Sequence, residues 1–309
     1  MNYIFGPVPS RRLGYSLGVD PIPRKTCSFD CIYCEIGRTT HKTMERRPYL
    51  PIGPILEELQ DALSKIEALD FVTVSGSGEP TLHSGLGELI SGIKAITSFP
   101  VAVITNGSLF HEEAVRSALS QADVVIPSLD AVEESVYQVI NRPVGRLSLS
   151  AIQEGLIAFR NSYAGKLWLE ILLVRGINDN PGHLEGLRDF IKILGPDKVQ
   201  LNTVIRPPVE DYAYPLTSAQ LQDAQAILGD RVEIIANFSR PSLSAQGVPW
   251  GEEILDMIGR RPCTAQDLAM AVGIPVEEVI SFMNQLIAEG KGIYEVFDRK
   301  GFYRKAGTS

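Results

Sequence analysis

Three of the four cysteines in this 309-residue chain, Cys27, Cys31 and Cys34, fall within eight positions. Thiolates at spacings of four and three residues can converge on one metal centre when the segment that carries them is a loop. In a helix they would share a face and could be buried core residues. Two prolines upstream and a glycine downstream disfavour a long helix here. The spacing therefore predicts a metal centre held by a loop.

Two kinds of closed metal site compete with an open one. A structural zinc site takes four ligands, and His41 is the nearby residue that could complete it. A closed iron–sulfur cluster takes four cysteines, but Cys263 lies more than two hundred residues away. Three cysteines without a fourth suggest a cubane cluster with one iron left open. An open metal position is where a substrate or cosubstrate binds.

Repeated βα units are predicted to carry this site. Between residues 50 and 240 short β-branched runs alternate with helical patterns, which is typical of a parallel sheet covered by helices. The expected strands are 15–20, 71–75, 101–105, 124–129, 167–174, 198–204 and 231–235. Asp130 with Glu133 three residues later predicts a capped helix start after the fourth of them. Either an open doubly wound sheet or a barrel, complete or partial, would place the site at the carboxyl ends of the strands.

The cysteine motif, with Tyr33 before its last cysteine, resembles the hallmark of the radical S-adenosylmethionine (SAM) superfamily. Further landmarks follow in order at the ends of expected strands. Residues 75–80 (SGSGEP) resemble its GGE motif, with Ser77 in place of the first glycine. Residues 105–107 (TNG) and 127–130 (PSLD) are similar to the branch related to the wybutosine and molybdenum-cofactor enzymes. The resemblance covers residues 1–240 and implies an α/β fold, a partial (β/α)6 TIM-like barrel.

This resemblance implies two cofactors, a 4Fe-4S cluster on the three clustered cysteines and SAM on its fourth iron. The residues implied around SAM are Tyr33, Gly78, Glu79, Asn106 and Ser128. Glu79 would accept a charge-assisted hydrogen bond from the ammonium of SAM, and the glycines would let backbone carbonyls approach. Asn106 and Ser128 would face the adenosine, and Tyr33 the adenine. Without the cysteines, the same segments would be interpreted as ordinary turns.

Polar residues within the expected strands indicate either a satisfied polar network inside the barrel or a lumen that holds SAM and substrate. Glu170 interrupts LWLEILLV, where burying an unpaired carboxylate would be costly. It shares one face with Trp168, because side chains alternate along a strand. The candidate substrate-facing residues are Glu170, Gln200, Asn202, Arg11 and Arg12. Arg142 and Arg206 follow strand ends and could meet a carboxylate or a phosphate.

A Ser/Pro/Gly stretch near residue 240 predicts a division of the chain. The expected parts are a barrel at 1–240, a linker at 241–251 and a module at 252–309. In the module a helix at 252–259, a helix capped by Thr264, a helix opened by Pro275 and a hairpin follow in the order of a winged helix.

DNA reading by this module is disfavoured relative to protein or domain packing. The expected recognition helix carries Glu277, Glu278 and Glu289 and no Lys or Arg. The whole chain has a formal charge of −8, although residues 1–50 hold eight Lys or Arg against four Asp or Glu. This basic segment is either a rim that draws anionic ligands or a solvated loop.

The composition of the chain limits its structural class and its location in the cell. The proportions of hydrophobic (44%) and charged (21%) residues are those of a globular protein, which excludes a disordered or fibrous chain. No apolar run reaches the roughly 18 residues of a membrane span, and the first residues do not resemble a signal peptide. We therefore expect a cytoplasmic protein without a membrane partner.

The resemblance implies a radical SAM enzyme. An electron from ferredoxin or flavodoxin would reach the cluster, SAM would be cleaved to methionine and a 5′-deoxyadenosyl radical, and that radical would abstract hydrogen from an unidentified small-molecule, peptide or protein substrate. One alternative is a tRNA base-modifying enzyme of the wybutosine kind, disfavoured by the acidic body and by the lack of cysteines for a second cluster. A non-enzymatic zinc or iron–sulfur protein, or a regulator that acts through the C-terminal module, are further alternatives.

Overall fold

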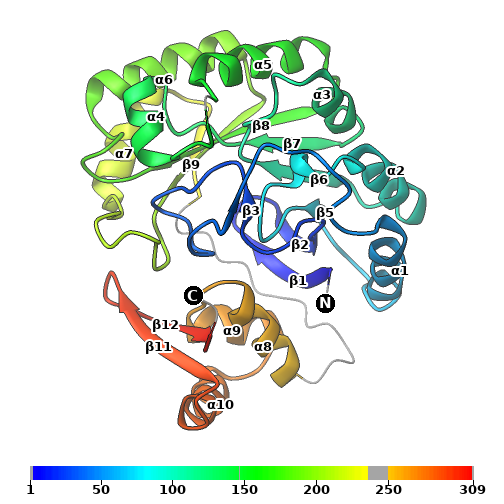
Figure 1. The fold of residues 1–309 in the computed structure, drawn as a ribbon. Helices are drawn as coiled ribbons and strands as arrows, with labels where there is room; N and C mark the ends of the chain where they lie inside the picture. Colours follow the sequence, from blue (N-terminus) through cyan, green and yellow to red (C-terminus); the bar gives the residue numbers. More distant parts are fainter. Residues whose placement is uncertain (1–2, 146, 236–249, 308–309) are drawn as a thin grey trace.

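A computed structural model of the chain describes residues 3–145, 147–235 and 250–307. Within them, the largest element is an eight-stranded sheet of order β1-β2-β5-β6-β7-β8-β9-β10. Its strands are β1 (Ile4–Ser10), β2 (Gly14–Val19), β5 (Phe71–Val74), β6 (Val101–Thr105), β7 (Val124–Pro127), β8 (Lys166–Leu173), β9 (Lys198–Thr203) and β10 (Val232–Ile234). The sheet curls into a half-barrel (Figure 1), so the expected partial barrel is confirmed.

Each strand expected from the sequence is present, and from β2 to β10 all neighbouring strands are parallel. β1 was not expected, and it pairs antiparallel with β2. Its sequence contains Pro7 and Pro9, which lack the N–H that a central strand must donate. β1 tolerates them because it lies at the edge of the sheet, with a partner on one side only.

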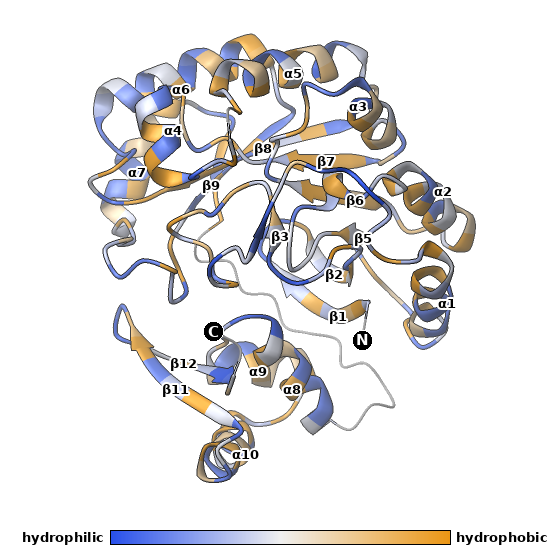
Figure 2. Ribbon diagram, in the orientation of Figure 1, coloured by the Kyte–Doolittle hydropathy of each residue, from blue (hydrophilic) through white to orange (hydrophobic). Residues whose placement is uncertain are grey.

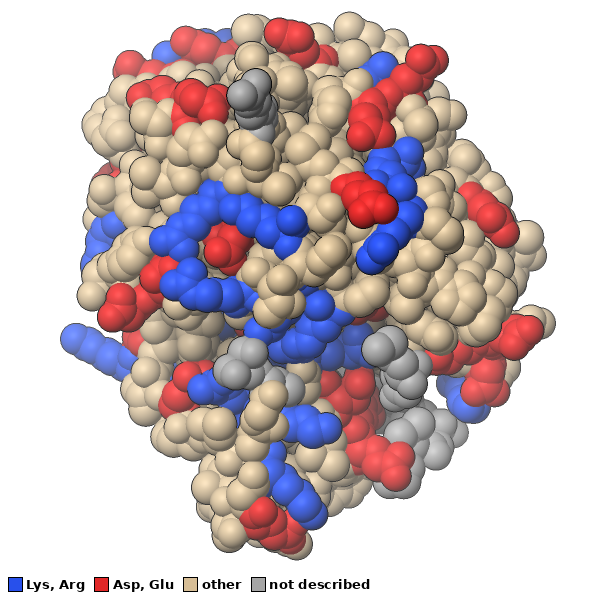
Figure 3. Space-filling view, viewed as in Figure 1, with Lys and Arg blue, Asp and Glu red and all other residues tan. Residues whose placement is uncertain are grey.

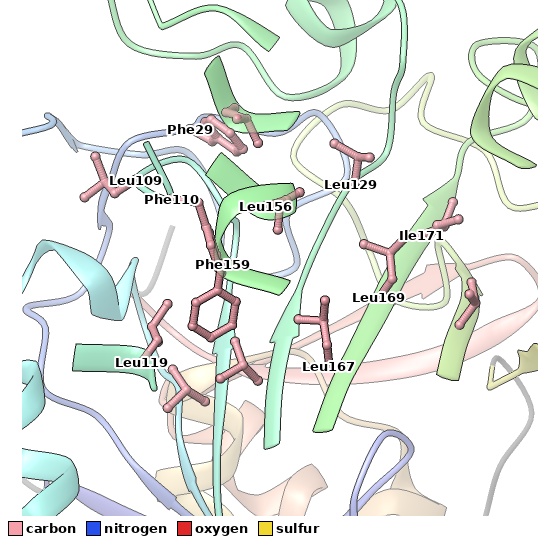
Figure 4. Packing of buried hydrophobic residues seen from close by; sticks show 14 of the residues in the cluster. Phe29, Leu109, Phe110, Leu119, Leu129, Leu156, Phe159, Leu167, Leu169 and Ile171 are labelled. Atoms are coloured by element: carbon pink, nitrogen blue, oxygen red, sulfur yellow. The ribbon is translucent and has the colours of Figure 1, made fainter. Parts of the chain in front are cut away.

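Helices connect the parallel strands and cover the convex side of the sheet (Figures 1 and 2). They are α1 (Ile52–Leu63), α2 (Leu86–Ile96), α3 (Glu113–Leu119), α4 (Glu134–Ile140), α5 (Leu149–Ser162), α6 (Pro181–Leu194) and α7 (Ser218–Leu228). The apolar side chains of α5 pack on the strands below it, and Phe159 meets Phe110 edge to face with their ring centroids 5.1 Å apart (Figure 4). Burial of these apolar faces is the main force that holds the helices on the sheet.

The two faces of β8 have different environments, as its sequence predicts. Leu167, Leu169 and Ile171 are fully buried in the main core between sheet and helices (Figure 4). Trp168 packs instead with a second group of apolar residues that includes Ala102 and Ile126 of β6 and β7. Glu170 therefore points to the concave side of the sheet, where a carboxylate can meet polar partners.

Short elements bring the cysteine loop over the carboxyl ends of the strands. β3 (Thr26–Cys27) pairs in parallel with β4 (His41–Lys42), and the loop that carries Cys31 and Cys34 lies between them. A single 3-10 turn, η1 (Pro80–Leu82), follows β5 and has Glu79 as its N-cap residue. The first cysteine and Glu79 are thus both placed by backbone pairing rather than by free loops.

The C-terminal part has the expected order of three helices and a hairpin. Its elements are α8 (Trp250–Arg260), α9 (Ala265–Val272), α10 (Val276–Ala288), β11 (Gly292–Phe297) and β12 (Lys300–Lys305). Its buried side chains, such as Leu268 and Met283, form a cluster of their own. Its assignment as a winged helix stays a prediction, and we call residues 250–307 the C-terminal module.

α8 begins at Trp250, two residues before the expected start of the module at residue 252, and the division of the chain into barrel, linker and module stays a prediction. The Trp250 ring packs edge to face on Phe282 of α10, 5.0 Å between centroids, and this contact anchors the first turn. The rest of the expected linker falls at 241–249, outside the described residues. No helix of the described residues is long and apolar enough to cross a bilayer.

Replacing Thr264 by alanine is expected to lower the stability of the C-terminal module by about 1 kcal/mol, the usual cost of losing an N-cap. The Thr264 hydroxyl accepts from the Asp267 backbone N–H at 3.1 Å, and the Asp267 carboxylate accepts from the Thr264 N–H at 3.2 Å. Urea unfolding measures the loss. Thr264→Ser keeps the hydroxyl and should match the parent, so an equal loss in both variants would contradict this role of the cap.

Candidate active site

A cavity of about 1040 Å³ opens at the carboxyl ends of the strands and is shared with the C-terminal module. Cys27, Cys31 and Cys34 all line it. Residues 75–80 after β5, 104–106 at the end of β6 and Ser128 after β7 line it as well. The landmarks that the sequence places after successive strands are therefore brought around one space, as expected for parallel strands.

The three cysteines are free thiols held by polar contacts. The Asn106 side-chain amide donates to the Cys27 Sγ at 3.4 Å, and the Asn141 amide donates to the Cys31 Sγ at 3.5 Å. Burial, with the nearby Glu79 carboxylate, raises the pKa of the Cys27 thiol to about 12. Without a metal these thiols are therefore protonated at neutral pH, and metal binding must release their protons.

This donor set fits a cluster better than a single zinc ion. The fourth ligand of the zinc alternative, His41, is exposed on β4. In the part of the chain that the structure describes, no three His, Cys, Asp or Glu side chains form a group that could hold one metal ion. A four-iron cluster is wider than an ion, so the thiolates that hold it stand further apart. Three thiols around a common cavity match that requirement.

The segment that resembles the GGE motif packs directly against the cysteine loop. The Glu79 N–H donates to the Thr26 carbonyl at 3.0 Å, one residue before Cys27. A Cβ on Gly78 would lie 2.1 Å from that same carbonyl oxygen, so only glycine permits the approach. Ser77, the departure from the family pattern, donates to the Asp20 carboxylate through both its N–H (3.0 Å) and its hydroxyl (2.8 Å).

Glu79 is a buried carboxylate with no cationic partner among the described residues. Its side chain is well packed, since the whole residue is 2% exposed. Oε1 accepts from the Thr81 N–H and hydroxyl and from the Thr105 hydroxyl, whereas Oε2 accepts only from the Asn106 N–H at 2.7 Å. Burial raises its pKa, and these hydrogen bonds oppose the rise. Oε2 can accept one further donor, and the negative charge lacks a counter-charge.

The other residues expected around SAM are placed differently from one another. Asn106 and Ser128 line the cavity, but the Asn106 amide is also bonded to the Ser28 hydroxyl at 2.9 Å. Tyr33 is not among the lining residues, and its hydroxyl donates to the Asp130 carboxylate at 2.5 Å. The structure thus brings Gly78, Glu79, Asn106 and Ser128 to the cavity, whereas the Tyr33 hydroxyl is bonded to Asp130 and the residue does not line the cavity.

The expected role of Asp130 as a helix cap is wrong. α4 begins at Glu134 with Glu133 as its N-cap residue. The Asp130 carboxylate instead accepts from the Leu172 N–H at 2.9 Å and from the Asn141 amide at 2.8 Å. The end of β7 lies beside β8 at this point, so the carboxylate satisfies a strand N–H. Burial raises the pKa of Asp130 to about 6.

A polar network crosses the inside of the barrel from the β1–β2 turn to β8 and β9. Arg12 forms a bidentate pair with Glu170 at 2.7 and 2.6 Å. The Asn202 amide donates to Glu170 at 2.9 Å, and Arg11 donates to the Asn202 carbonyl oxygen at 2.9 Å. The Gln200 amide donates to the Arg12 carbonyl at 2.9 Å. Most of the polar groups therefore satisfy one another, as one interpretation of the sequence required, although the Gln200 side-chain oxygen is buried without a partner among the described residues.

The same network also reaches the cavity, as the other interpretation required. Arg11, Arg12 and Glu170 line it, whereas Gln200 and Asn202 lie behind them. Although burial opposes ionisation, Arg12 holds the pKa of Glu170 below its ordinary value. Glu170 is therefore a carboxylate at neutral pH.

The basic residues of the first 50 positions are only partly directed to the cavity. Lys and Arg side chains gather across the middle of the face in Figure 3, where the barrel meets the C-terminal module. Arg38 pairs with Glu210 at 2.6 Å, and Arg46 lies 3.6 Å from Glu112. Of the eight basic residues, Arg11, Arg12 and Lys25 line the cavity.

The C-terminal module forms one wall of the cavity, which the sequence did not reveal. Its lining residues include Met257, Arg260, Arg261, Asp267, Lys300 and Phe302. The basic pair Arg260–Arg261 at the end of α8 was the one signal in the sequence that this module faces the cavity. By itself, such a pair cannot be distinguished from basic residues on a solvated surface.

Arg206 joins this wall to the cysteine loop. It lies 3.0 Å from Glu35, the residue after Cys34, and 3.6 Å from Asp267 of α9. Burial alone would raise the pKa of Glu35, but the positive charges of Arg206 and Arg261 lower it below its ordinary value. Arg206 thus meets carboxylates of this chain, and Arg142 likewise pairs with Glu210 at 2.6 Å.

Comparisons with known proteins agree with the geometry. The chain is 36% identical over 291 residues to a protein of Brachyspira hyodysenteriae named GTPase Obg, covering 93% of this chain but only 43% of that protein. It is 35% identical over 315 residues to the UPF0026 protein MJ1312 of Methanocaldococcus jannaschii, covering 99% of this chain and 96% of that protein.

A solved structure shares the fold. SuiB of Streptococcus suis, bound to S-adenosylmethionine, matches with a TM-score of 0.53 at 14% identity, over 72% of this chain and 50% of that chain. A sequence profile described as the Radical SAM superfamily matches residues 22–189, more than half of the chain. Members of this superfamily are enzymes that use a 4Fe-4S cluster and SAM. The chain belongs to the radical SAM superfamily.

Proposed function

We propose that Cys27, Cys31 and Cys34 hold the 4Fe-4S cluster of this enzyme, and that Glu79 and its neighbours hold SAM beside it. One observation carries the proposal: three free thiols and a buried carboxylate without a cation face the same cavity. Thiolates are the ligands of iron–sulfur clusters, and an ammonium is the counter-charge that Glu79 lacks.

When bound, the cluster and SAM supply a 5′-deoxyadenosyl radical that abstracts hydrogen from the substrate. The protein binds, orients and shields these groups. Glu79 accepts a hydrogen bond from the ammonium of SAM on Oε2, while Oε1 keeps its hydrogen bonds from the hydroxyls of Thr81 and Thr105. Asn106 and Ser128 offer polar groups to the adenosine. The barrel and the C-terminal module together exclude water, which protects reactive intermediates.

The partners follow from this chemistry. A one-electron donor such as ferredoxin or flavodoxin would supply the reductant. The substrate is a small molecule, peptide or protein that binds in the barrel beside Arg12 and Glu170. We retain the cytoplasm as its expected location, where such donors occur.

The deciding experiment is anaerobic reconstitution with iron and sulfide, followed by dithionite and SAM. A brown protein that absorbs near 400 nm and forms 5′-deoxyadenosine supports the proposal. An intact cluster that forms none would refute it. A colourless preparation with stoichiometric zinc would support the non-enzymatic alternative instead.

Glu79→Gln is expected to weaken SAM binding about tenfold to a hundredfold, because a hydrogen bond to a charged group contributes about 1.5–3 kcal/mol. Equilibrium binding of SAM to the reconstituted, unreduced enzyme measures this. Iron content and melting temperature should stay near the parent values. Glu185→Gln, at an exposed position of α6, is the matched control. Equal SAM affinity in both variants would assign Glu79 a purely structural role.

A tRNA substrate of the wybutosine kind is the second candidate. It is favoured by the basic side chains that gather on the face shown in Figure 3. It is also favoured by the exposure of Arg38, Lys42 and Arg47 in the basic segment of the first 50 residues. A gel shift with bulk tRNA that weakens steeply with salt would support it. DNA reading by the C-terminal module is disfavoured, because Glu277 and Glu278 are exposed on α10.

A further inference from the structure

We propose that Arg11 binds a carboxylate or phosphate group of the substrate, so that the enzyme acts on a small organic oxyanion held inside the barrel. This inference rests on the proposed function, since it names the substrate class of the same cavity. It begins from a charge inside the barrel that the chain itself does not neutralise.

Arg11 lines the cavity and has no carboxylate within ion-pairing distance among the described residues. Its one side-chain partner there is the neutral amide of Asn202, which accepts from Nη1 at 2.9 Å. A guanidinium carries five N–H donors in a fork that matches a carboxylate or phosphate. Arg11 therefore has a full positive charge and several unused donors facing the space where a ligand would bind.

The surrounding charges do not supply the missing anion. The two nearest carboxylates are already paired, Glu170 with Arg12 at 2.6 Å and Glu35 with Arg206 at 3.0 Å. Asp267 lies 3.6 Å from Arg206, and Arg261 lies 3.7 Å from Glu35. With these two included, the group that contains Arg11 holds four positive and three negative charges, an excess of one positive charge. Burial, with repulsion from Arg206 and Arg12, lowers the pKa of Arg11 to about 9. An anionic ligand would offset both the desolvation of the Arg11 guanidinium and its repulsion by the two neighbouring arginines.

Other cations at the cavity have other ways to be stabilised. Arg299 and Lys300 are exposed, so water screens their charges. Lys25 is buried, but its charge lies near the thiol of Cys34 and would face the anionic cluster. Arg260 and Arg261 have carboxylate partners, Asp256 at 2.9 Å and Glu35 at 3.7 Å. Among the described residues that line the cavity, Arg11 is thus the unpaired cation that remains for the substrate.

The carboxylate of SAM is not the anion that Arg11 awaits. Glu79, where the ammonium of SAM would bind, contacts Thr105 and Asn106 at the end of β6, whereas Arg11 contacts Asn202 on β9. β7 and β8 lie between these strands. With neighbouring strands about 4.8 Å apart, the three spacings from β6 to β9 amount to about 14 Å along the sheet. The amino and carboxylate groups of SAM share one carbon atom and cannot reach both.

The place of Arg11 favours a small molecule over a polymer. Arg11 is in the turn between β1 and β2, and its side chain crosses to β9 inside the barrel. The phosphates of a tRNA remain on its backbone and would not enter the barrel. The cavity of about 1040 Å³ is slightly larger than the usual range of about 300–1,000 Å³ for small-molecule sites. It can take SAM together with a compact acid or phosphate ester.

The test uses inorganic phosphate and acetate as probes, titrated calorimetrically into the reconstituted, SAM-saturated and unreduced holoenzyme. We expect at least one of the two anions to bind the parent enzyme. Arg11→Gln should weaken this binding at least about tenfold. Arg11→Lys should be intermediate, because it keeps the charge and loses the fork. Arg188→Gln, which removes one surface charge from α6, should bind like the parent.

Three outcomes would overturn the inference. The first is that the parent enzyme binds neither anion, and the second is that Arg11→Gln binds the anions as tightly as the parent does. The third is that Arg11→Gln loses as much affinity for SAM as for the anions, which would assign Arg11 to the cosubstrate. Cluster absorption and melting temperature identify a variant that fails to fold. If Arg11→Gln fails to fold, anion binding by Arg11→Lys is compared with that by the parent instead. A parent that binds phosphate yet forms no 5′-deoxyadenosine would refute the proposed function and leave the anion site standing.

Discussion

Cys31→Ser is expected to reduce both bound iron and 5′-deoxyadenosine formation below detection. Cys31 lines the cavity between Cys27 and Cys34, and the chain offers no substitute thiol nearby. A serine hydroxyl is a far weaker ligand for iron than a thiolate, and a cluster left on two cysteines would be lost. Iron and sulfide analysis, the absorbance near 400 nm and chromatography of the products measure the effect. Cys27→Ser and Cys34→Ser should behave alike.

Cys263→Ser is the matched control. Cys263 is fully buried in the C-terminal module, where its backbone pairs with Tyr303 and its thiol donates to the Arg261 carbonyl at 3.5 Å. A serine can keep that hydrogen bond, so cluster content and product formation should match the parent. If Cys31→Ser kept its iron, or if Cys263→Ser lost it, the assignment of the cluster ligands would be wrong.

Arg12→Met is expected to destabilise the barrel by about 3–5 kcal/mol, the cost of leaving one member of a buried ion pair without its partner. The Glu170 side chain is only 4% exposed, and both of its oxygens accept from Arg12. Equilibrium unfolding in urea at pH 7 measures the loss. Adding Glu170→Leu to Arg12→Met should recover part of it, because no unpaired charge then remains. Asp61→Asn, which breaks an exposed pair with Lys65, should cost less than about 0.5 kcal/mol.

The pH dependence gives a second measure of this ion pair. Burial alone would raise the pKa of Glu170, but Arg12 lowers it below its ordinary value. A lowered native pKa means that the pair stabilises the fold above the unfolded pKa of about 4.3 and that this contribution is lost as the pH falls through the native value. The gap in stability between the parent and Glu170→Gln should be constant from pH 6 to 8 and should shrink in acid.

The strands and the cysteine loop could be predicted because their signals are local. β-branched runs mark β5 to β9, and proline and glycine around Cys27 to Cys34 disfavour a long helix. Lumen polarity was also predictable, since Glu170 alternates with buried leucines along one strand. β1 escaped prediction because its two prolines argue against a strand unless its edge position is known.

Contacts between distant segments were not predictable. Asp130 has the spacing of a helix cap, yet its carboxylate accepts a hydrogen bond from the N–H of Leu172 on the next strand. Arg206 follows a strand, but its partners Glu35 and Asp267 come from the cysteine loop and from the C-terminal module. Such pairings depend on which loops meet at the carboxyl edge of the sheet, which no local pattern encodes.

Both loops that we propose to hold the cofactors are connected to the C-terminal module by ion pairs. Asp20, which anchors Ser77, lies 3.5 Å from Arg260, and Glu35, next to Cys34, is joined through Arg206 to Asp267. If SAM binds more tightly when the C-terminal module is docked on the barrel, then SAM must stabilise the docked module by the same factor, because such coupling is reciprocal. The ion pairs predict this outcome, since they connect the module to the loops proposed to hold the cluster and SAM.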